Sequence, residues 1–111
     1  MKFYYNGKLV RTSRTHEYNF AAISPTGKCL TCSATYEGCA KNLAALTANR
    51  RGWLSNYEEV YRGTFKETKG GWTIKDIMGW FHNSREELKE AIEKEKAYVD
   101  GIKIVKLEAR A

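Results

Sequence analysis

The sequence predicts an α+β fold: an antiparallel β-sheet, built from N-terminal strands and one C-terminal strand, packed by two or three helices on one side. Turn residues separate aromatic and β-branched runs near the N-terminus, which is typical of antiparallel strands. After these runs, apolar residues recur at helical spacing, and a final run at 102–108 predicts the last strand. The chain has 111 residues, a length that suits a single domain over residues 1–111.

The N-terminal strands are predicted from their turns. Asn6-Gly7 accepts the positive φ angles of a two-residue type I′ turn, so the residues around it should form a hairpin. The run Ser24-Pro25-Thr26-Gly27 is typical of a loop between two further strands. The strands expected from these turns and from the C-terminal run are residues 3–5, 8–10, 16–23, 28–36 and 102–108.

Alternation along residues 28–36 decides how the cysteines are interpreted. Leu30 and Cys32 should share a core-facing side, while Cys29 and Thr31 should share the side that can meet solvent or a ligand. Cys29 and Cys32 would then point to opposite faces and could not hold a metal ion together. We expect the cysteines, Cys39 included, to be small core residues in a reducing cytosol, with no metal site and no cofactor.

The helices are predicted from spacing and capping residues. One helix should open near Thr35 and end near residue 49, where Arg50 and Arg51 suit the helix dipole. Its buried side should carry Cys39, Ala40, Leu43, Ala44 and Leu46. A short second helix should end at Gly63, followed by a strand at 64–68 and a turn at 69–71.

Two capping boxes predict the remaining helices. Thr73 and Asp76 should start one or two helical turns over residues 74–81. Ser84 and Glu87 should start a helix over 85–99, although residues 97–99 can alternatively pair with the last strand as a hairpin.

The positive charge lies in the N-terminal half. Residues 1–51 hold eight basic and two acidic residues, a net charge of +6 that equals the net charge of the whole chain. A one-sided basic field attracts polyanions and phosphate-bearing ligands.

Catalytic and nucleotide-binding fingerprints are absent from the sequence. It contains no Gly-x-Ser-x-Gly elbow, no P-loop and no Gly-x-Gly-x-x-Gly motif. Because no paired carboxylates accompany the two histidines, His16 and His82, we expect a protein that is not an enzyme. No apolar run approaches the roughly 20 residues that span a bilayer, so we expect a cytoplasmic protein without a membrane partner.

A loose group of side chains could bind a phosphate-bearing ligand. Arginine pairs bidentately with phosphate, aromatic rings stack on bases, and a helix N-terminus presents unpaired N–H groups. The predicted phosphate-binding residues are Arg11, Arg14, Arg50, Arg51, Asn83 and Ser84. The predicted stacking residues are Phe81, Trp53 and Trp80, of which Trp80 should mostly pack and Phe81 should face the ligand.

The stretch HEYNFAAISPTGKCLTCSATYEGCAKNLAALTAN, residues 16–49, resembles the arm-type DNA-binding domain of phage integrases. In those domains Gly-Lys follows a hairpin turn and a threonine opens a helix, as Gly27-Lys28 and Thr35 do here. The resemblance implies DNA binding through the N-terminal sheet.

As a whole the chain is short, basic, aromatic and without a catalytic motif, and it is similar in style to small proteins of phages and mobile elements. Among these are anti-defence proteins, including sponges that sequester a signalling nucleotide. That resemblance implies ligand pockets between subunits, and the 14 aromatic residues could also supply an interface, so we expect a homo-oligomer.

These observations favour a non-catalytic, phage-type binding protein that sequesters a phosphate-bearing ligand, first of all a signalling nucleotide, in the cytoplasm of a host bacterium. A small nucleotide needs few arginines and one stacking ring, whereas a long duplex prefers a denser basic stripe. The alternatives are a DNA- or RNA-binding accessory protein that uses the basic N-terminal sheet, and a protein inhibitor of a bacterial defence enzyme.

Overall fold

The computed structural model describes residues 1–66 and 71–111 and divides the chain into two compact units. The first unit comprises Met1–Thr47 and Gly101–Ala111, and the second comprises Ala48–Asp100. The α+β class is confirmed, because the described residues form six strands and three helices. Residues 64–66 have no regular structure, and residues 67–70, which include part of the expected strand and turn, lie outside the described residues.

Sheet A combines both ends of the chain. Strands β1 (Lys2–Tyr5), β2 (Lys8–Thr12) and β6 (Glu108–Arg110) are antiparallel neighbours in the order β2-β1-β6. The predicted hairpin is confirmed, since Asn6 and Gly7 have φ angles of 48° and 76°, both in the region that a type I′ turn requires.

Sheet B is a second antiparallel sheet, so the prediction of a single sheet is wrong. It contains β3 (Phe20–Ile23), β4 (Cys29–Ser33) and β5 (Lys103–Lys106) in the order β4-β3-β5. The C-terminal run divides at Leu107, because β5 pairs with β3 whereas β6 pairs with β1. Leu107 is buried, and its N–H donates to the carbonyl oxygen of Asn19 over 2.7 Å at this crossing point.

The core of the first unit lies between the two sheets. Phe3 of β1 is fully buried and meets Tyr18 edge-to-face, with ring centroids 5.7 Å apart. Burying a side chain of this size contributes roughly 1.5–3 kcal/mol. The buried members of this cluster are Phe3, Ala21, Cys32 and Leu107.

A β-bulge in β4 changes the direction of Cys29. Thr31 and Cys29 pair with consecutive residues of β3, which leaves Leu30 as the extra residue. Cys29 therefore lies on the same face as Cys32, and their Sγ atoms are 3.3 Å apart. The prediction that these side chains point to opposite faces is wrong, because it assumed an unbroken alternation.

The other face of β4 packs against helix α1 (Tyr36–Arg62). Asn42 Nδ2 donates to Thr31 Oγ1 over 3.3 Å, so α1 crosses this face directly. Gly38 lies so close to Ser33 that a Cβ atom at Gly38 would be 2.3 Å from Ser33 Oγ. This face is therefore covered by a helix, contrary to the expectation that it could meet a ligand.

Helix α1 is one continuous helix of 27 residues, not two short helices. Arg50 and Arg51 lie inside it, and the helix continues through Gly52 although glycine costs about 1 kcal/mol relative to alanine in a helix. The helix ends where Gly63 has a φ angle of 75°, as predicted. Its buried stripe differs from the prediction: Leu46 is 58% exposed, whereas Thr47 is only 3% exposed.

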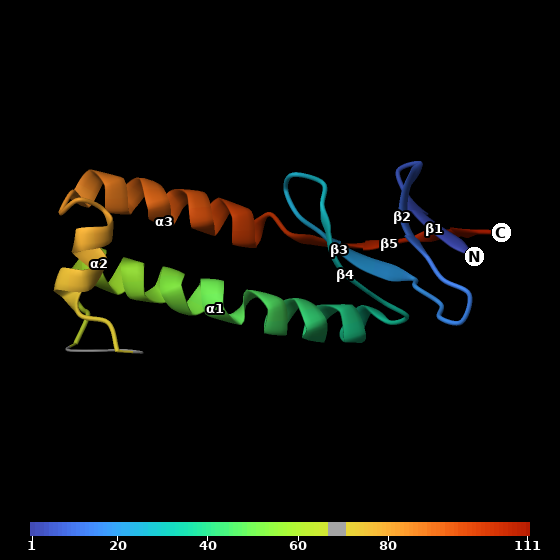
Figure 1. Cartoon of the computed structure of the whole chain (residues 1–111), viewed down its shortest axis with the longest axis horizontal. Helices are drawn as coiled ribbons and strands as arrows, with labels where there is room; N and C mark the ends of the chain where they lie inside the picture. The colour runs from blue at the N-terminus through green and yellow to red at the C-terminus, as the bar shows by residue number, and fades with distance from the viewer. Residues whose placement is uncertain (67–70) are drawn as a thin grey trace. The chain divides into compact units, whose positions relative to one another are not determined.

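The second unit contains the end of α1, helix α2 (Ile74–Trp80) and helix α3 (Arg85–Asp100). Figure 1 shows α2 placed between the end of α1 and the start of α3. Both helices begin where the capping residues predict, and residues 97–99 belong to α3 and not to a hairpin. Their shared core contains the buried residues Val60, Phe65, Ile77 and Leu88.

Candidate phosphate-binding surface

The excess positive charge of the chain belongs entirely to the first unit. Met1–Thr47 and Gly101–Ala111 together hold nine basic and three acidic residues, a net charge of +6. Ala48–Asp100 holds ten basic and ten acidic residues and is neutral. The C-terminal residues Lys103, Lys106 and Arg110 join the N-terminal cations because β5 and β6 complete the two sheets. The fold therefore keeps the same division as the chain, with a net charge of +6 in one part and none in the other.

Sheet A carries the densest group of cations in the first unit. Four of the twelve residues in its strands are Lys or Arg, and Glu108 is the single acidic residue among them. Phe3 faces the core, so its neighbours Lys2 and Tyr4 face outward. The strand register places four further residues on this outer face: Leu9, Thr12, Glu108 and Arg110.

The outer face of sheet A combines an aromatic ring with cations. The Arg110 guanidinium carbon lies 4.8 Å from the ring centroid of Tyr4, and Arg110 also forms a 3.3 Å ion pair with Glu108. Lys2 is exposed beside them, and Leu9 is 53% exposed. A guanidinium stacked on a ring keeps its N–H donors available in the plane, where a phosphate can accept them.

Arg11 and Arg14 were predicted from sequence to bind phosphate, and both belong to the first unit. The Arg11 guanidinium carbon lies 5.0 Å from the ring centroid of Tyr18, which also stacks on His16 at 6.1 Å. Arg11 remains exposed while its direction is restricted by the ring. Arg14 is exposed in the segment between β2 and β3. Because Arg11 pairs with Phe3, it lies on the opposite side of β2 from the outer face that carries Lys2 and Tyr4.

Arg50 and Arg51 belong to the second unit. Arg50 Nη1 forms a 3.0 Å ion pair with Glu95 Oε1, and the Arg50 guanidinium carbon lies 4.3 Å from the ring centroid of Tyr98. These contacts join α1 to α3 and occupy the Arg50 guanidinium. Arg51, also on α1, is exposed.

The predicted stacking rings all belong to the second unit, but their exposure differs from the expectation. Phe81 meets Tyr57 edge-to-face at 5.2 Å and packs against the helical core. Trp80 is instead 49% exposed and Trp53 is 44% exposed, and each meets Trp72, at 4.8 Å and 6.2 Å respectively. Trp80, rather than Phe81, therefore offers the more accessible ring.

Asn83 and Ser84 use their backbone N–H groups within the chain. The Asn83 N–H donates to the Met78 carbonyl oxygen over 2.7 Å, and the Ser84 N–H donates to the Phe81 carbonyl oxygen over 2.9 Å. Ser84 Oγ accepts from the Glu87 N–H over 3.2 Å, which caps α3. The N–H groups that were expected to hold an anion at these two positions are therefore already paired.

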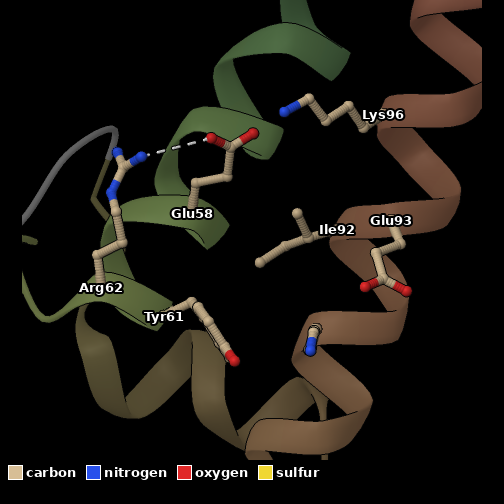
Figure 2. A pocket seen from close by; sticks show the side chains of 7 residues that line it. Glu58, Tyr61, Arg62, Ile92, Glu93 and Lys96 are labelled. Carbon is tan, nitrogen blue, oxygen red and sulfur yellow. Dashed lines mark ion pairs between the residues drawn. The ribbon is translucent and has the colours of Figure 1, made fainter.

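A groove of about 300 Å³ lies between the end of α1 and α3 in the second unit. Figure 2 shows Tyr61 of α1 and Ile92 of α3 projecting toward this space. Charged side chains border it, and one pair, Arg62 with Glu58, forms a 3.7 Å ion pair on α1. The lining residues are Glu58, Tyr61, Arg62, Lys89, Ile92, Glu93 and Lys96. We call this cavity the α1–α3 groove, and none of the site residues predicted from sequence lines it.

The sequence prediction missed Lys2, Tyr4 and Arg110. The register of the Asn6-Gly7 hairpin already places Lys2 and Tyr4 on one side of β1. The sequence therefore contains enough information to predict this part of the surface. The position of Arg110 cannot be predicted in this way, because it depends on the long-range pairing of β6 with β1.

Two other features are absent from the described residues: a cluster of metal ligands and a helix that could cross a membrane. Across residues 1–66 and 71–111, no three or more His, Cys, Asp or Glu side chains are grouped so that they could hold a metal ion. In the same part of the chain, no helix has the length and the apolar character needed to cross a membrane.

No protein-family model, no curated protein and no solved structure matches this chain. The resemblances to arm-type DNA-binding domains and to phage anti-defence proteins therefore stay predictions.

Proposed function

We propose that this protein is a non-catalytic binding protein for nucleic acid, and that the outer face of sheet A and the exposed strand β2 form its contact surface. The observation that carries the proposal is the placement of the whole net charge of +6 in the first unit. A chain of phosphates is attracted by such a field and gains affinity as each cation releases condensed counterions.

The distribution of these cations favours a polymer over a small ligand. The cations on and beside sheet A lie along neighbouring strands, on both sides of the edge strand β2, and do not converge on a cavity. A small nucleotide instead needs cations directed into one pocket, which usually buries most of the ligand. Five exposed cations lie on or beside sheet A: Lys2 and Arg110 on the outer face, Lys8 and Arg11 on the opposite side of the edge strand β2, and Arg14 in the segment that follows it.

The proposal is tested by the salt dependence of binding to fluorescent single-stranded and double-stranded oligonucleotides. If all five cations contact phosphates, the logarithm of the association constant should fall with the logarithm of salt with a slope of roughly −3.5 to −4.5. Between about 50 and 200 mM salt the affinity should then fall roughly 100- to 500-fold. Absence of binding at the lower salt, or a slope shallower than about −1, would overturn the proposal.

A second candidate is sequestration of a small signalling nucleotide, the function implied by the resemblance to anti-defence sponges. The α1–α3 groove favours it, because about 300 Å³ lies at the lower limit of typical small-ligand sites. Tyr61 and Ile92 supply apolar contacts for a base, and Lys89 and Lys96 supply cations for a phosphate.

The second candidate is tested by thermal unfolding with a panel of linear and cyclic nucleotides. A ligand at 100 times its dissociation constant adds about 2.7 kcal/mol to the free energy of unfolding. Lys96→Ala should reduce the shift, whereas Lys94→Ala, an exposed position on the same helix outside the groove, should leave it unchanged. If no nucleotide in the panel raises the unfolding temperature, or if both variants respond alike, the groove is not the site.

A further inference from the structure

Two thiols face one another in the core of the first unit. Cys29 Sγ and Cys32 Sγ are 3.3 Å apart, although two residues separate them on a strand. The β-bulge in β4 is responsible, because it turns Cys29 onto the face that already carries Cys32. A disulfide bond requires about 2.05 Å between sulfurs, so closing this pair needs a displacement of only about 1 Å.

The surroundings keep Cys29 protonated and give the two thiols unequal access to solvent. Burial and the neighbouring Cys32 raise the pKa of Cys29 to about 12, while the nearby Arg11 opposes the shift. At neutral pH Cys29 is therefore a thiol and not a thiolate that would recruit a metal ion. Cys29 is partly exposed, whereas Cys32 is buried, so a reagent in solution reaches Cys29 first.

We propose that Cys29 and Cys32 are a redox-responsive dithiol, which closes reversibly into an intramolecular disulfide when the chain meets a low-molecular-weight disulfide such as oxidised glutathione. Cys29 loses its proton and attacks one sulfur of the oxidant, which releases one glutathione thiolate and leaves a mixed disulfide. Cys32 then loses its proton and attacks the Cys29 sulfur, which releases the second glutathione. Two protein thiols are oxidised, one S–S bond forms, and the oxidant is reduced to two glutathione molecules.

Cys39 provides the matched control. It is fully buried on α1, and burial raises the pKa of its thiol. The sulfur within hydrogen-bonding distance of Cys29 Sγ is that of Cys32 and not that of Cys39. A pair defined by the bulge should therefore form without Cys39, whereas a non-specific oxidation should draw on all three thiols.

The test exposes the full-length chain to oxidised glutathione at a pH of about 8.5, where more thiolate is available. Free thiols are then counted by alkylation under denaturing conditions, and the intact mass is measured. The wild-type chain should lose two of its three thiols, lose the mass of two hydrogen atoms, and carry no glutathione. Cleavage after Glu37 separates Cys39 from the pair and should leave the disulfide in the N-terminal fragment.

Two variants complete the test, with far-UV circular dichroism to establish that each is folded. Cys39→Ala should lose both of its thiols as a disulfide, and dithiothreitol should restore them. Cys29→Ala should form no internal disulfide. The proposal is overturned if the folded wild-type chain keeps all three thiols under conditions that fully oxidise dithiothreitol. It is equally overturned if Cys39 enters the disulfide, or if glutathione stays on Cys29 without displacement by Cys32.

Discussion

The close approach of α1 to β4 makes Gly38→Ala a sensitive probe of packing in the first unit. A Cβ atom at this position lies 2.3 Å from Ser33 Oγ and 3.0 Å from Thr35 Oγ1, so neighbouring atoms must move. Overpacking of this kind costs typically about 1–3 kcal/mol. Alanine recovers up to about 1 kcal/mol through its better helix propensity. We expect Gly38→Ala to lower the free energy of unfolding by a net amount of up to about 2 kcal/mol.

A double-mutant cycle separates the clash from the propensity term. In a Ser33→Ala chain the closest remaining Ser33 atom is its Cβ, at 3.4 Å, which is ordinary van der Waals contact. The approach to Thr35 Oγ1 at 3.0 Å remains, so Gly38→Ala should cost less in that background, by at least about 0.5 kcal/mol, as measured by urea unfolding followed by circular dichroism. Equal costs in both backgrounds would refute the packing of α1 on β4. The face of β4 that carries Thr31 and Ser33 would then be open to a ligand.

Three further changes test the second unit. Leu88→Ala should lower the free energy of unfolding by about 2–5 kcal/mol, because Leu88 is fully buried in the helical core; a cost below about 1 kcal/mol in urea unfolding would contradict that placement. Hydrogen bonds with the Thr73 backbone N–H and hydroxyl lower the pKa of Asp76. The Asp76 carboxylate therefore stabilises the fold above pH ~4, and this stabilisation is lost as the pH falls through the lowered pKa of the folded state. Asp76→Asn should flatten the acid side of the stability profile, and an unchanged profile would argue against the capping box. Phe81→Ala should lower the unfolding temperature more than Trp80→Ala, because Phe81 packs into the core whereas Trp80 is half-exposed; the opposite order would restore Phe81 as the accessible ring.

Local signals in the sequence predicted the elements that depend on neighbouring residues. Asn6-Gly7 fixed the first hairpin because few residue pairs accept positive φ at both positions of a turn. Thr73 and Ser84 marked the starts of α2 and α3 because each supplies an oxygen to an unpaired backbone N–H. Such features need no knowledge of the rest of the fold.

Long-range pairing explains the main errors in the predicted fold. The division of the last strand at Leu107 depends on two different partners, β3 and β1, and alternation within residues 102–108 does not encode them. The bulge that brings Cys29 beside Cys32 depends on the register between β3 and β4. Charge alone predicts a helix end at Arg50 and Arg51, but the dipole effect is a few tenths of a kcal/mol to about 1 kcal/mol and cannot end a helix by itself.

The sequence predicts the chemical character of the candidate site, which is basic and aromatic, but it locates only some of the residues. Charge counting along the chain located the basic half, and the first unit carries the same net charge of +6, because the C-terminal cations take the place of Arg50 and Arg51. The six predicted phosphate-binding residues divide between the units: Arg11 and Arg14 belong to the first, and the other four belong to the second. Composition can show that cations and rings are present, but burial and pairing decide which of them are accessible. Arg50 and Phe81 illustrate this, since both have partners within the chain.

The most direct measurement compares the salt dependence of oligonucleotide binding in Lys2→Ala and Lys94→Ala chains. Both lysines are exposed and both substitutions remove one positive charge, but Lys2 lies on sheet A and Lys94 lies on α3 of the neutral unit. Lys2→Ala should make the slope of the logarithm of affinity against the logarithm of salt shallower by about 1, while Lys94→Ala should leave the slope unchanged. Equal changes in the two chains, or a larger change in the Lys94 variant, would contradict a nucleic-acid contact on sheet A.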